Sequence, residues 1–417
     1  MKNILIAIRS IFKKGRHNVM KIVSLGIGLA VGLVLIAKVY FEQSYDGFYP
    51  DRDRVYQVWA KYQQNGGELK DYPQTSGGIA PTMQQQIPEI ETVTRYTSFG
   101  DWTFTMTDTK MKYSGRCIIA DSCFFDILPR PMLIGNAKEV LSTPMYVLVS
   151  SRIAKNIGGD VIGKNFTVDS SPGRTMTIGG VFEEVPENSH SRYDVIVSMA
   201  SAGRFMWEGS PTNMLGNDRY ISYVKLHKGV NPLALEEQVH TFVNSYFPPE
   251  EQQKTGFNIG FSFHELDGLH KELPQVKRMT WILSLLAFAL IFTAVMNYIL
   301  IVISSIVNRS KEVAVHKCYG ASENNIHGMM FGEALVHIVL SLILALLLIL
   351  AFRGTVEELL ATSLDSLLLS NGSLVLLGIC ILVFFVSGFM PGSWPPLSVI
   401  TGRISVSGRK PCCLSSL

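Results

Sequence analysis

The sequence predicts a membrane protein with four transmembrane α-helices and a large mixed α/β extracytoplasmic domain inserted between helices 1 and 2. Three observations lead to this prediction. The chain of 417 residues is 47% hydrophobic and has a positive mean hydropathy. Four apolar runs are long enough to cross about 30 Å of hydrocarbon, which takes about 20 helical residues. The stretch from Phe41 to Arg278 contains no such run.

The apolar runs set the predicted membrane spans. The first run is longer than the apolar core of a signal peptide, and Phe41-Glu42-Gln43-Ser44-Tyr45 after it is not a small-residue cleavage site. We therefore expect an uncleaved anchor, interrupted only by Lys38 near its outer end. The predicted spans are residues 22–40, 279–306, 332–352 and 373–391.

The positions of lysine and arginine predict the orientation, because loops rich in these residues stay on the cytoplasmic side. Residues 1–21 and the loops 307–331 and 392–417 are basic, whereas the short loop 353–372 has an excess of acidic residues. Both termini are therefore expected in the cytoplasm of a bacterial inner membrane, with residues 41–278 in the periplasm. The tail is expected to be disordered. The basic residues are Lys2, Arg9, Lys13, Lys14, Arg16, Lys21, Arg309, Lys311, Lys317, Arg403, Arg409 and Lys410.

Three residues within the spans suggest helix packing. Gly28 and Gly32 form a GxxxG pair, which lets two helices approach closely, either within one subunit or between two subunits. Asn297 is polar at mid-membrane and is expected to face another helix. The span that contains it has about 26 apolar residues and reaches roughly 39 Å, so part of it should project out of the bilayer.

The segment 41–278 is large enough for its own core and for two subdomains. Its sequence predicts mixed α/β structure. A helix should follow Asn231-Pro232, because Leu235, Val239, Phe242 and Val243 then fall on one face, and another should run over Ile79–Gln86 and stop at Pro88. The predicted strands are Tyr146–Val149, Met176–Phe182, Asp194–Val197 and Tyr220–Leu226.

Two patterns in this segment only approximate known motifs for catalysis or metal binding. Residues 158–165 nearly spell the phosphate-binding sequence GxxxxGK[ST], but Asn165 replaces the hydroxyl and no strand leads into the loop, so a structural turn is expected. His264 and His270 are six residues apart, which puts them on different faces of a helix, unlike the pair of HExxH. The sequence therefore predicts no catalytic residue and no metal site.

The cysteines add little. Cys117 and Cys123 lie in the predicted periplasmic segment and could either form a disulfide in that oxidising compartment or remain two unpaired thiols. The others lie at or in the membrane or in the tail: Cys318, Cys380, Cys412 and Cys413.

The turn between the second and third spans carries the most specific pattern. Residues 309–321 read Arg-Ser-Lys-Glu-Val-Ala-Val-His-Lys-Cys-Tyr-Gly-Ala. This run resembles the signature RxKEIGIRKxxGA of the FtsX-like permease family, the membrane subunits of MacB-type ABC transporters. It differs from the signature at Ala314, where the family has Gly, and at His316, where the family has Arg. Without this resemblance, an ordinary polar turn with cytoplasmic positive charge would explain the segment.

Landmarks outside the spans extend the resemblance. Residues 41–48 and 53–58 look like the opening of the MacB-like periplasmic core domain. Ala80-Pro81, Ile87-Pro88-Glu89, Phe124-Phe125-Asp126, Ile162-Gly163-Lys164, Gly180-Val181-Phe182 and Pro186-Glu187-Asn188-Ser189-His190 follow in the order of that domain. The resemblance assigns residues 41–278 to the core domain and about 279–400 to the FtsX-like permease domain. The tandem permeases of Bacteroidetes-type bacteria are the most similar in pattern.

The resemblance implies that the chain is a permease subunit that hydrolyses nothing itself. It would couple ATP hydrolysis by a separate cytoplasmic ATPase of the MacB/LolD type to a periplasmic conformational change that exports or extrudes an envelope-associated or toxic substrate. The resemblance therefore implies mechanotransmission, in which the chain passes a conformational change across the membrane. The chain itself is expected to bind no cofactor, and ATP and magnesium are expected in the partner ATPase. The residues expected to form the coupling helix on that ATPase are Arg309, Lys311, Glu312, Val313, Val315, His316, Lys317 and Gly320.

Further partners follow from the same resemblance. ABC permeases need two membrane halves, so a second permease half is expected, and a periplasmic adaptor and an outer-membrane protein are further expected partners; nucleic acid is not. After Gly392 the chain departs from the family pattern and ends in a stretch rich in serine, cysteine and basic residues. Two interpretations remain open: the first half of a truncated tandem permease, or a half-transporter that works as a homodimer.

A second function class shares the ATPase contact. FtsX-like signalling scaffolds regulate a periplasmic cell-envelope partner rather than exporting a substrate, although their outer domains are usually much smaller. The size of residues 41–278 favours the transporter. The sequence does not identify the cargo.

Overall fold

The computed structural model describes residues 18–216, 218–308 and 323–368, together with residues 372, 374, 375, 378, 379 and 382. The chain divides into two compact units. Residues 1–43 and 274–417 form one, which we call the helical unit. Residues 44–273 form the other, which we call the α/β unit.

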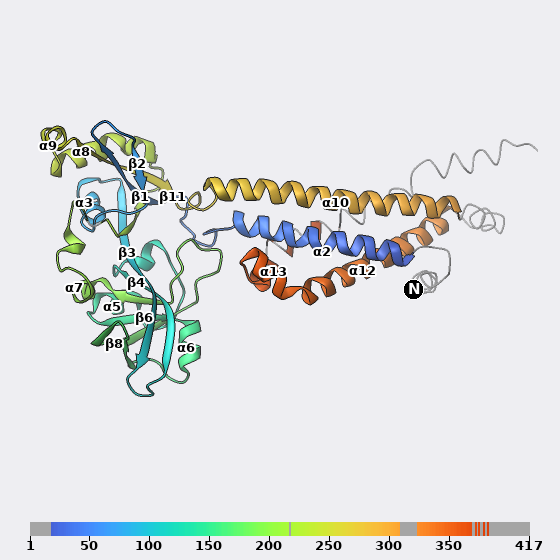
Figure 1. Cartoon of the computed structure of the whole chain (residues 1–417), viewed down its shortest axis with the longest axis horizontal. Helices are drawn as coiled ribbons and strands as arrows, with labels where there is room; N and C mark the ends of the chain where they lie inside the picture. The colour runs from blue at the N-terminus through green and yellow to red at the C-terminus, as the bar shows by residue number, and fades with distance from the viewer. Residues whose placement is uncertain are drawn as a thin grey trace, which may run out of the picture. The chain divides into compact units, whose positions relative to one another are not determined.

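Three long helices build the helical unit, and in Figure 1 they run side by side. They are α2 (Asn18–Gln43), α10 (Pro274–Asn308) and α12 (Glu323–Ala351), and α2 packs against both of the others. The buried residues Leu25 and Leu29 of α2 pack in one core with Tyr298 of α10 and Ile338 and Ala345 of α12. The three helices are only weakly amphipathic, because both their packed and their outer faces are apolar.

The outward-facing side chains of α10 are large and apolar. Trp281, Leu285 and Phe288 are each more than two-thirds exposed, at 78%, 69% and 68%. Such a continuous apolar surface would aggregate in water, and it suits contact with lipid chains. By length and hydropathy, Val19–Gln43 and Pro274–Leu300 can each cross a membrane.

The described residues contain two such spans, or three if one bent helix pair is counted. That pair is Leu335–Ala351 followed by Arg353–Leu360, with a bend of 69°. The predicted fourth span at 373–391 lies almost wholly outside the described residues, so the four-helix prediction is not tested. The segment predicted as a short loop contains two helices, α13 (Arg353–Leu360) and α14 (Leu364–Leu368).

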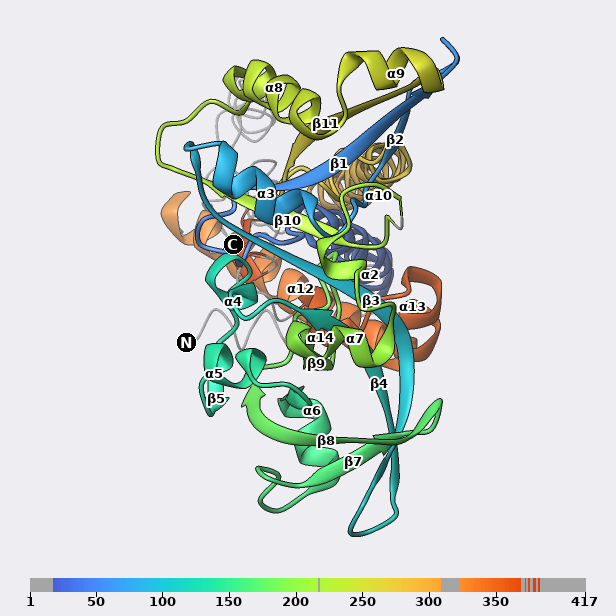
Figure 2. The ribbon, with the colours of Figure 1, turned by 90° about the vertical axis from the view of Figure 1, so that its left-hand side faces the viewer.

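One 11-stranded sheet organises the α/β unit (Figure 2), in the order β11-β1-β10-β3-β4-β9-β6-β8-β5, with β2 beside β1 and β7 beside β3 and β8. Most neighbours are antiparallel, and β4 with β9 and β6 with β8 are parallel. The strands are β1 (Val55–Gln64), β2 (Lys70–Tyr72), β3 (Ile90–Met106), β4 (Lys112–Ala120), β5 (Met132–Ile134), β6 (Tyr146–Ser150), β7 (Asn165–Val168), β8 (Ser171–Phe182), β9 (Val195–Ser198), β10 (Ile221–Leu226) and β11 (Phe257–Glu265).

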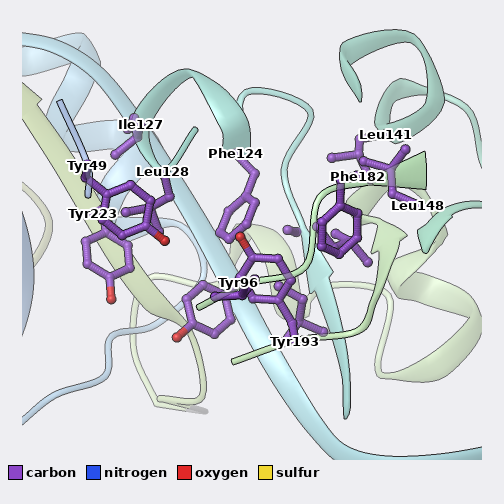
Figure 3. Packing of buried hydrophobic residues seen from close by; sticks show 14 of the residues in the cluster. Tyr49, Tyr96, Phe124, Ile127, Leu128, Leu141, Leu148, Phe182, Tyr193 and Tyr223 are labelled. Atoms are coloured by element: carbon purple, nitrogen blue, oxygen red, sulfur yellow. The ribbon is translucent and has the colours of Figure 1, made fainter. Parts of the chain in front are cut away.

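The long strands β3 and β4 join the two halves of this sheet. Their register shifts between Ser98 and Gly100, and Gly100 has a φ of 73°, a conformation that glycine adopts without steric cost. Along β3, Ile90 and Val93 belong to one buried core, Tyr96 to a second, and Phe104 and Met106 to a third. Figure 3 shows Tyr96, Phe124, Tyr193 and Tyr223 of the second core.

Seven α-helices and three 3₁₀ turns of the described residues complete the α/β unit. The predicted strands correspond to β6, β8, β9 and β10, and the helix predicted at Ile79–Gln86 has those bounds. The four residues predicted to share one helix face after Pro232 are all buried, at 6% exposure or less. The helices are α3 (Ile79–Gln86), α4 (Phe124–Ile127), α5 (Ala137–Ser142), α6 (Ser151–Ile157), α7 (Ala202–Phe205), α8 (Glu236–Tyr246) and α9 (Pro249–Thr255), with η1 (Met199–Ser201), η2 (Ser210–Thr212) and η3 (Pro232–Leu235).

Candidate functional site

A buried polar cluster holds the segment through which the chain enters the α/β unit. We call Ser44–Gly47 the entering segment, because it directly follows α2 in the chain. Asp46 is completely buried and takes a left-handed backbone conformation, with a φ of 56°. Its carboxyl group accepts hydrogen bonds from Ser189 Oγ at 2.9 Å and from the backbone N–H of His190 at 3.3 Å. Burial of a carboxyl group is costly unless its oxygens are satisfied, and these bonds satisfy them.

His190 extends this cluster to the centre of the sheet. Its Nδ1 lies 2.7 Å from Asp46 Oδ2, and its Nε2 is hydrogen-bonded to the phenol oxygen of Tyr223 on β10. Burial raises the pKa of the Tyr223 phenol well above its usual value, so this hydroxyl stays protonated. Tyr96 on β3 lies beside Tyr223, with ring centroids 6.3 Å apart, and bonds Ser191 at 2.6 Å.

The segment through which the chain leaves the α/β unit is tied to the entering segment. We call Leu266–Leu273 the leaving segment; it follows β11 and precedes α10. The rings of Tyr45 and His270 stack with centroids 3.4 Å apart and planes 7° from parallel. Arg52 donates to the Gly47 carbonyl and pairs with Asp267 at 3.1 Å. The entering and leaving segments are therefore held together by one aromatic stack and one arginine.

We call the entering and leaving segments, with the residues that tie them, the junction; its Asp46 and His190 side chains are shielded from solvent. Asp46 is inaccessible and the His190 side chain is only 18% exposed. One cavity of the α/β unit lies at the end of β1, and another is lined by the loop after β10. Neither cavity is lined by Asp46, His190 or Tyr223.

In the helical unit, the two glycines predicted for helix packing face α10, whereas Asn297 is exposed and reaches α2 through one hydrogen bond. A Cβ atom on Gly28 would lie 2.4 Å from the Ala294 Cβ, and one on Gly32 would lie 2.7 Å from Ile291 Cγ1. Both glycines therefore let α2 approach α10 within this subunit. Asn297 Nδ2 lies 3.4 Å from Ser24 Oγ of α2.

The lysine that interrupts the first apolar run is also accommodated between helices. Lys38 is 7% exposed and pairs with Glu42 one turn later, at 2.6 Å. Its ammonium group also donates to Thr362 Oγ1 at 2.8 Å. A buried charge in an apolar helix needs such a partner, and Glu42 provides it.

The predicted coupling residues cannot be placed. Arg309, Lys311, Glu312, Val313, Val315, His316, Lys317 and Gly320 all lie outside the described residues. Their role in coupling stays a prediction from the sequence.

The near-motifs have structural roles. The glycine-rich run 158–164 is a turn between α6 and β7, in which Gly158, Gly159 and Gly163 have positive φ. The rings of His264 and Trp59 stack with centroids 4.1 Å apart, whereas His270 stacks on Tyr45. Cys117 is a buried free cysteine, and Cys123 is a free cysteine whose Sγ lies 3.1 Å from the Val93 carbonyl. The bridged alternative is thus not the one adopted.

The sequence alone did not reveal the junction. In the sequence, Asp46 and His190 belong to two separate landmarks of the periplasmic core domain, 144 positions apart. The available signal is weak: a polar run, Asn188-Ser189-His190, that follows a hydrophobic strand and in which Ser189 is buried.

Comparisons with known proteins relate both units to described families. Residues 20–242 match the family described as MacB-like periplasmic core domain, and residues 284–401 match the family described as FtsX-like permease C-terminal. A solved domain of a candidate permease protein from Porphyromonas gingivalis is similar, with 32% sequence identity over 52% of this chain and 91% of that chain and a TM-score of 0.48. The extracellular domain of the noncanonic ABC-type transporter YknZ from Gram-positive bacteria shares 10% identity over 49% of this chain and 98% of that chain, with a TM-score of 0.35. No curated protein matched the chain.

Proposed function

Because the chain belongs to the MacB-like and FtsX-like family of ABC transporter permeases, we propose that it couples ATP hydrolysis by a separate cytoplasmic ATPase to a conformational change of the α/β unit. The family consists of membrane permeases with a large extracellular α/β domain, and its permeases are generally not enzymes themselves. The cargo that we propose is an envelope-associated or toxic substrate, extruded outside the membrane rather than carried through this subunit.

The observation that carries this proposal is the tie between the entering and leaving segments. Tyr45 stacks on His270, and Arg52 links Gly47 to Asp267. The entering segment continues from α2 along the chain and the leaving segment continues into α10. In this proposal, a displacement of α2 or α10 pulls on the entering or leaving segment. The contacts of Asp46 and His190 then transmit the displacement to β10 and β3.

Coupling needs a partner ATPase, a second permease half and a cytoplasmic contact. We propose that Lys311 and Glu312 form part of that contact, with Val313 and Val315 as apolar anchors, since interfaces combine such anchors with a charged rim. The second half comes either from a second copy or from a tandem or paralogous chain. A periplasmic adaptor and an outer-membrane protein complete the proposed assembly in a bacterial inner membrane.

Reconstitution with the partner ATPase tests the proposal. Copurification in mild detergent identifies that ATPase, and lipid nanodiscs then hold the complex. We expect no ATP hydrolysis by the permease alone, and hydrolysis by the complex. The double charge reversal Lys311→Glu with Glu312→Lys should separate the two subunits without unfolding the α/β unit. Hydrolysis by the permease alone, or intact binding after the reversal, contradicts the proposal.

A matched pair of variants tests the junction itself. His270→Ala removes the ring that stacks on Tyr45, and His264→Ala removes a histidine stacked on Trp59 elsewhere in the same unit. We expect His270→Ala to keep ATPase binding but lose the dependence of the outer-domain conformation on nucleotide, measured by hydrogen exchange. His264→Ala should keep both. Equal behaviour of the two variants would remove the junction from the mechanism.

The signalling alternative shares the ATPase contact and differs in the phenotype. Deletion of the partner ATPase should impair efflux or envelope maturation if the chain is a transporter. Loss of the activity of a periplasmic cell-wall partner, with export intact, would favour the signalling scaffold instead.

A further inference from the structure

A groove of about 850 Å³ opens on the α/β unit at the end of β1. Its walls come from the three strands β1, β2 and β11, the loop before β10, the residue that follows α8 and the last residue of α9. The lining residues that matter here are Tyr62, Tyr72, Asp218, Phe247, Phe257 and Ile259.

The strand register explains why aromatic side chains line this groove. Tyr62 pairs with Ile259, and Ala60 pairs with Tyr72 on the other side of β1. Since side chains alternate along a strand, these residues share the face on which Val58 and Tyr56 are buried. The groove is therefore the open end of the core beneath α3 and α8.

The rings form a continuous aromatic wall. Tyr62 lies 5.6 Å from Tyr72 and 5.3 Å from Phe257, measured between ring centroids. Phe247 and Ile259 are buried and form the floor, whereas Tyr72 is 44% exposed at the rim. Together with Ile259, these rings give the groove a mostly apolar and aromatic lining.

One carboxyl group lies in this wall. Asp218 Oδ2 accepts a hydrogen bond from the Tyr62 phenol at 2.5 Å, and its Oδ1 accepts one from the buried Ser76 hydroxyl. Burial, with the bond to Asp218 next, raises the pKa of Tyr62, so the phenol stays a donor. Among the ion pairs of the described residues, none joins a lysine or arginine to Asp218. A carboxylate has about four acceptor positions, so it keeps capacity for a cationic partner.

We propose that this groove binds an organic cation with an apolar body. Ring faces attract a cation through their quadrupoles, and Asp218 supplies a full negative charge beside them. An anion would be repelled by Asp218, and a neutral apolar ligand would remove water from the carboxylate without replacing it. This proposal adds a ligand class to the proposed function. It rests on that function in one respect, namely that the ligand is met outside the membrane.

Two ions of the same size and shape test the charge preference. Tetraphenylphosphonium and tetraphenylborate are titrated by calorimetry into the full chain in nanodiscs, with empty nanodiscs subtracted. We expect the phosphonium to bind at least roughly tenfold more tightly than the borate. Asp218→Asn should abolish that preference, and Tyr72→Ala should weaken phosphonium binding while leaving the floor intact.

Asp71→Asn is the matched control, because Asp71 is exposed on β2 and pairs with Lys61, which places it on the opposite face from Tyr72. It should leave binding unchanged. Equal binding of both ions, an Asp218→Asn variant that still discriminates, or an Asp71→Asn variant with the same loss would overturn the proposal. Equal, charge-independent binding would point to a neutral apolar segment as the occupant. Circular dichroism of each variant excludes misfolding.

These measurements use the permease without its ATPase. Failure of coupling in the reconstitution experiment therefore leaves the binding result unaffected, and failure of binding leaves coupling unaffected.

Discussion

The carboxyl group of Asp46 has no contact with solvent and depends on the donors around it. Asp46→Ala would leave the Ser189 hydroxyl and the His190 ring without their acceptor. We expect the free energy of unfolding to fall by about 3 kcal/mol. For a unit of this size, the melting temperature should fall by roughly 6–12 °C.

Thermal unfolding of the full chain in nanodiscs, followed by tryptophan fluorescence, measures this change. Asp71→Ala is the control, because exposed substitutions usually change stability by less than about 0.5 kcal/mol. An equal fall in the melting temperature of both variants would show that the buried hydrogen bonds of Asp46 do not stabilise the α/β unit.

His264 makes stability depend on pH. Burial holds the pKa of its imidazole below the usual value. The unfolded chain therefore binds more protons than the folded protein as the pH falls below about 6.5, so stability declines towards acid pH. His264→Phe keeps a ring on Trp59 and removes this titration. We expect its melting temperature to fall less than that of the original chain between about pH 8 and about pH 5. Parallel pH curves for the two proteins would refute this assignment.

At the scale of the element, some predictions followed directly from local chemistry. Pro88 cannot continue a helix, so α3 ends at Gln86 as its sequence indicates. The apolar face of α8 was readable because its spacing repeats with the helical period. In contrast, β1 and β11 are not among the predicted strands. In β1, Trp59 and Tyr62 fall on opposite faces and blur the alternation. In β11 the signal is present, because Phe257, Ile259, Phe261 and Phe263 alternate with smaller or polar residues.

The packing of α2 against α10 can be tested by size exchange. Gly28→Ala places a methyl group within 2.4 Å of the Ala294 Cβ. Overpacking of this kind costs about 1–3 kcal/mol, so the melting temperature of the helical unit should fall. Gly354→Ala in α13 is the control, because nothing lies within 4 Å of its Cβ position, and it should be neutral or stabilising.

Adding Ala294→Gly to Gly28→Ala should restore the original melting temperature. Restoration would assign the glycine to contact within the subunit. If Gly28→Ala instead reduces crosslinked dimers and Ala294→Gly gives no rescue, the contact lies between subunits.

At the scale of the whole molecule, the orientation remains a prediction from charge. We expect an impermeant thiol reagent to label Asp71→Cys on intact spheroplasts at once, because position 71 is exposed. Cys117 should react only after unfolding, since it is buried. Cys412 and Cys413 should react only after the membrane is permeabilised. Labelling of these tail cysteines in intact cells would reverse the orientation.

The sequence predicts which segments meet lipid and which meet water, because runs of apolar and charged residues can be read locally along the chain. It could not predict the junction or the groove. Asp46 meets His190, and Tyr62 meets Asp218, only after distant strands have paired, and 144 and 156 residues separate these partners. Such sites depend on register, which no local pattern encodes.

The stack of Tyr45 on His270 makes the α/β unit a cassette. Its two ends lie in ring contact, so it can be excised or transplanted without stretching the chain on either side. Joining its ends with a few glycines and opening the exposed turn at Thr109 should give a circular permutant that still unfolds cooperatively; a permutant without a cooperative transition would show that closeness of the ends is insufficient. Recombination between the ends would then exchange the α/β unit of one permease for that of another and leave the helical unit unchanged.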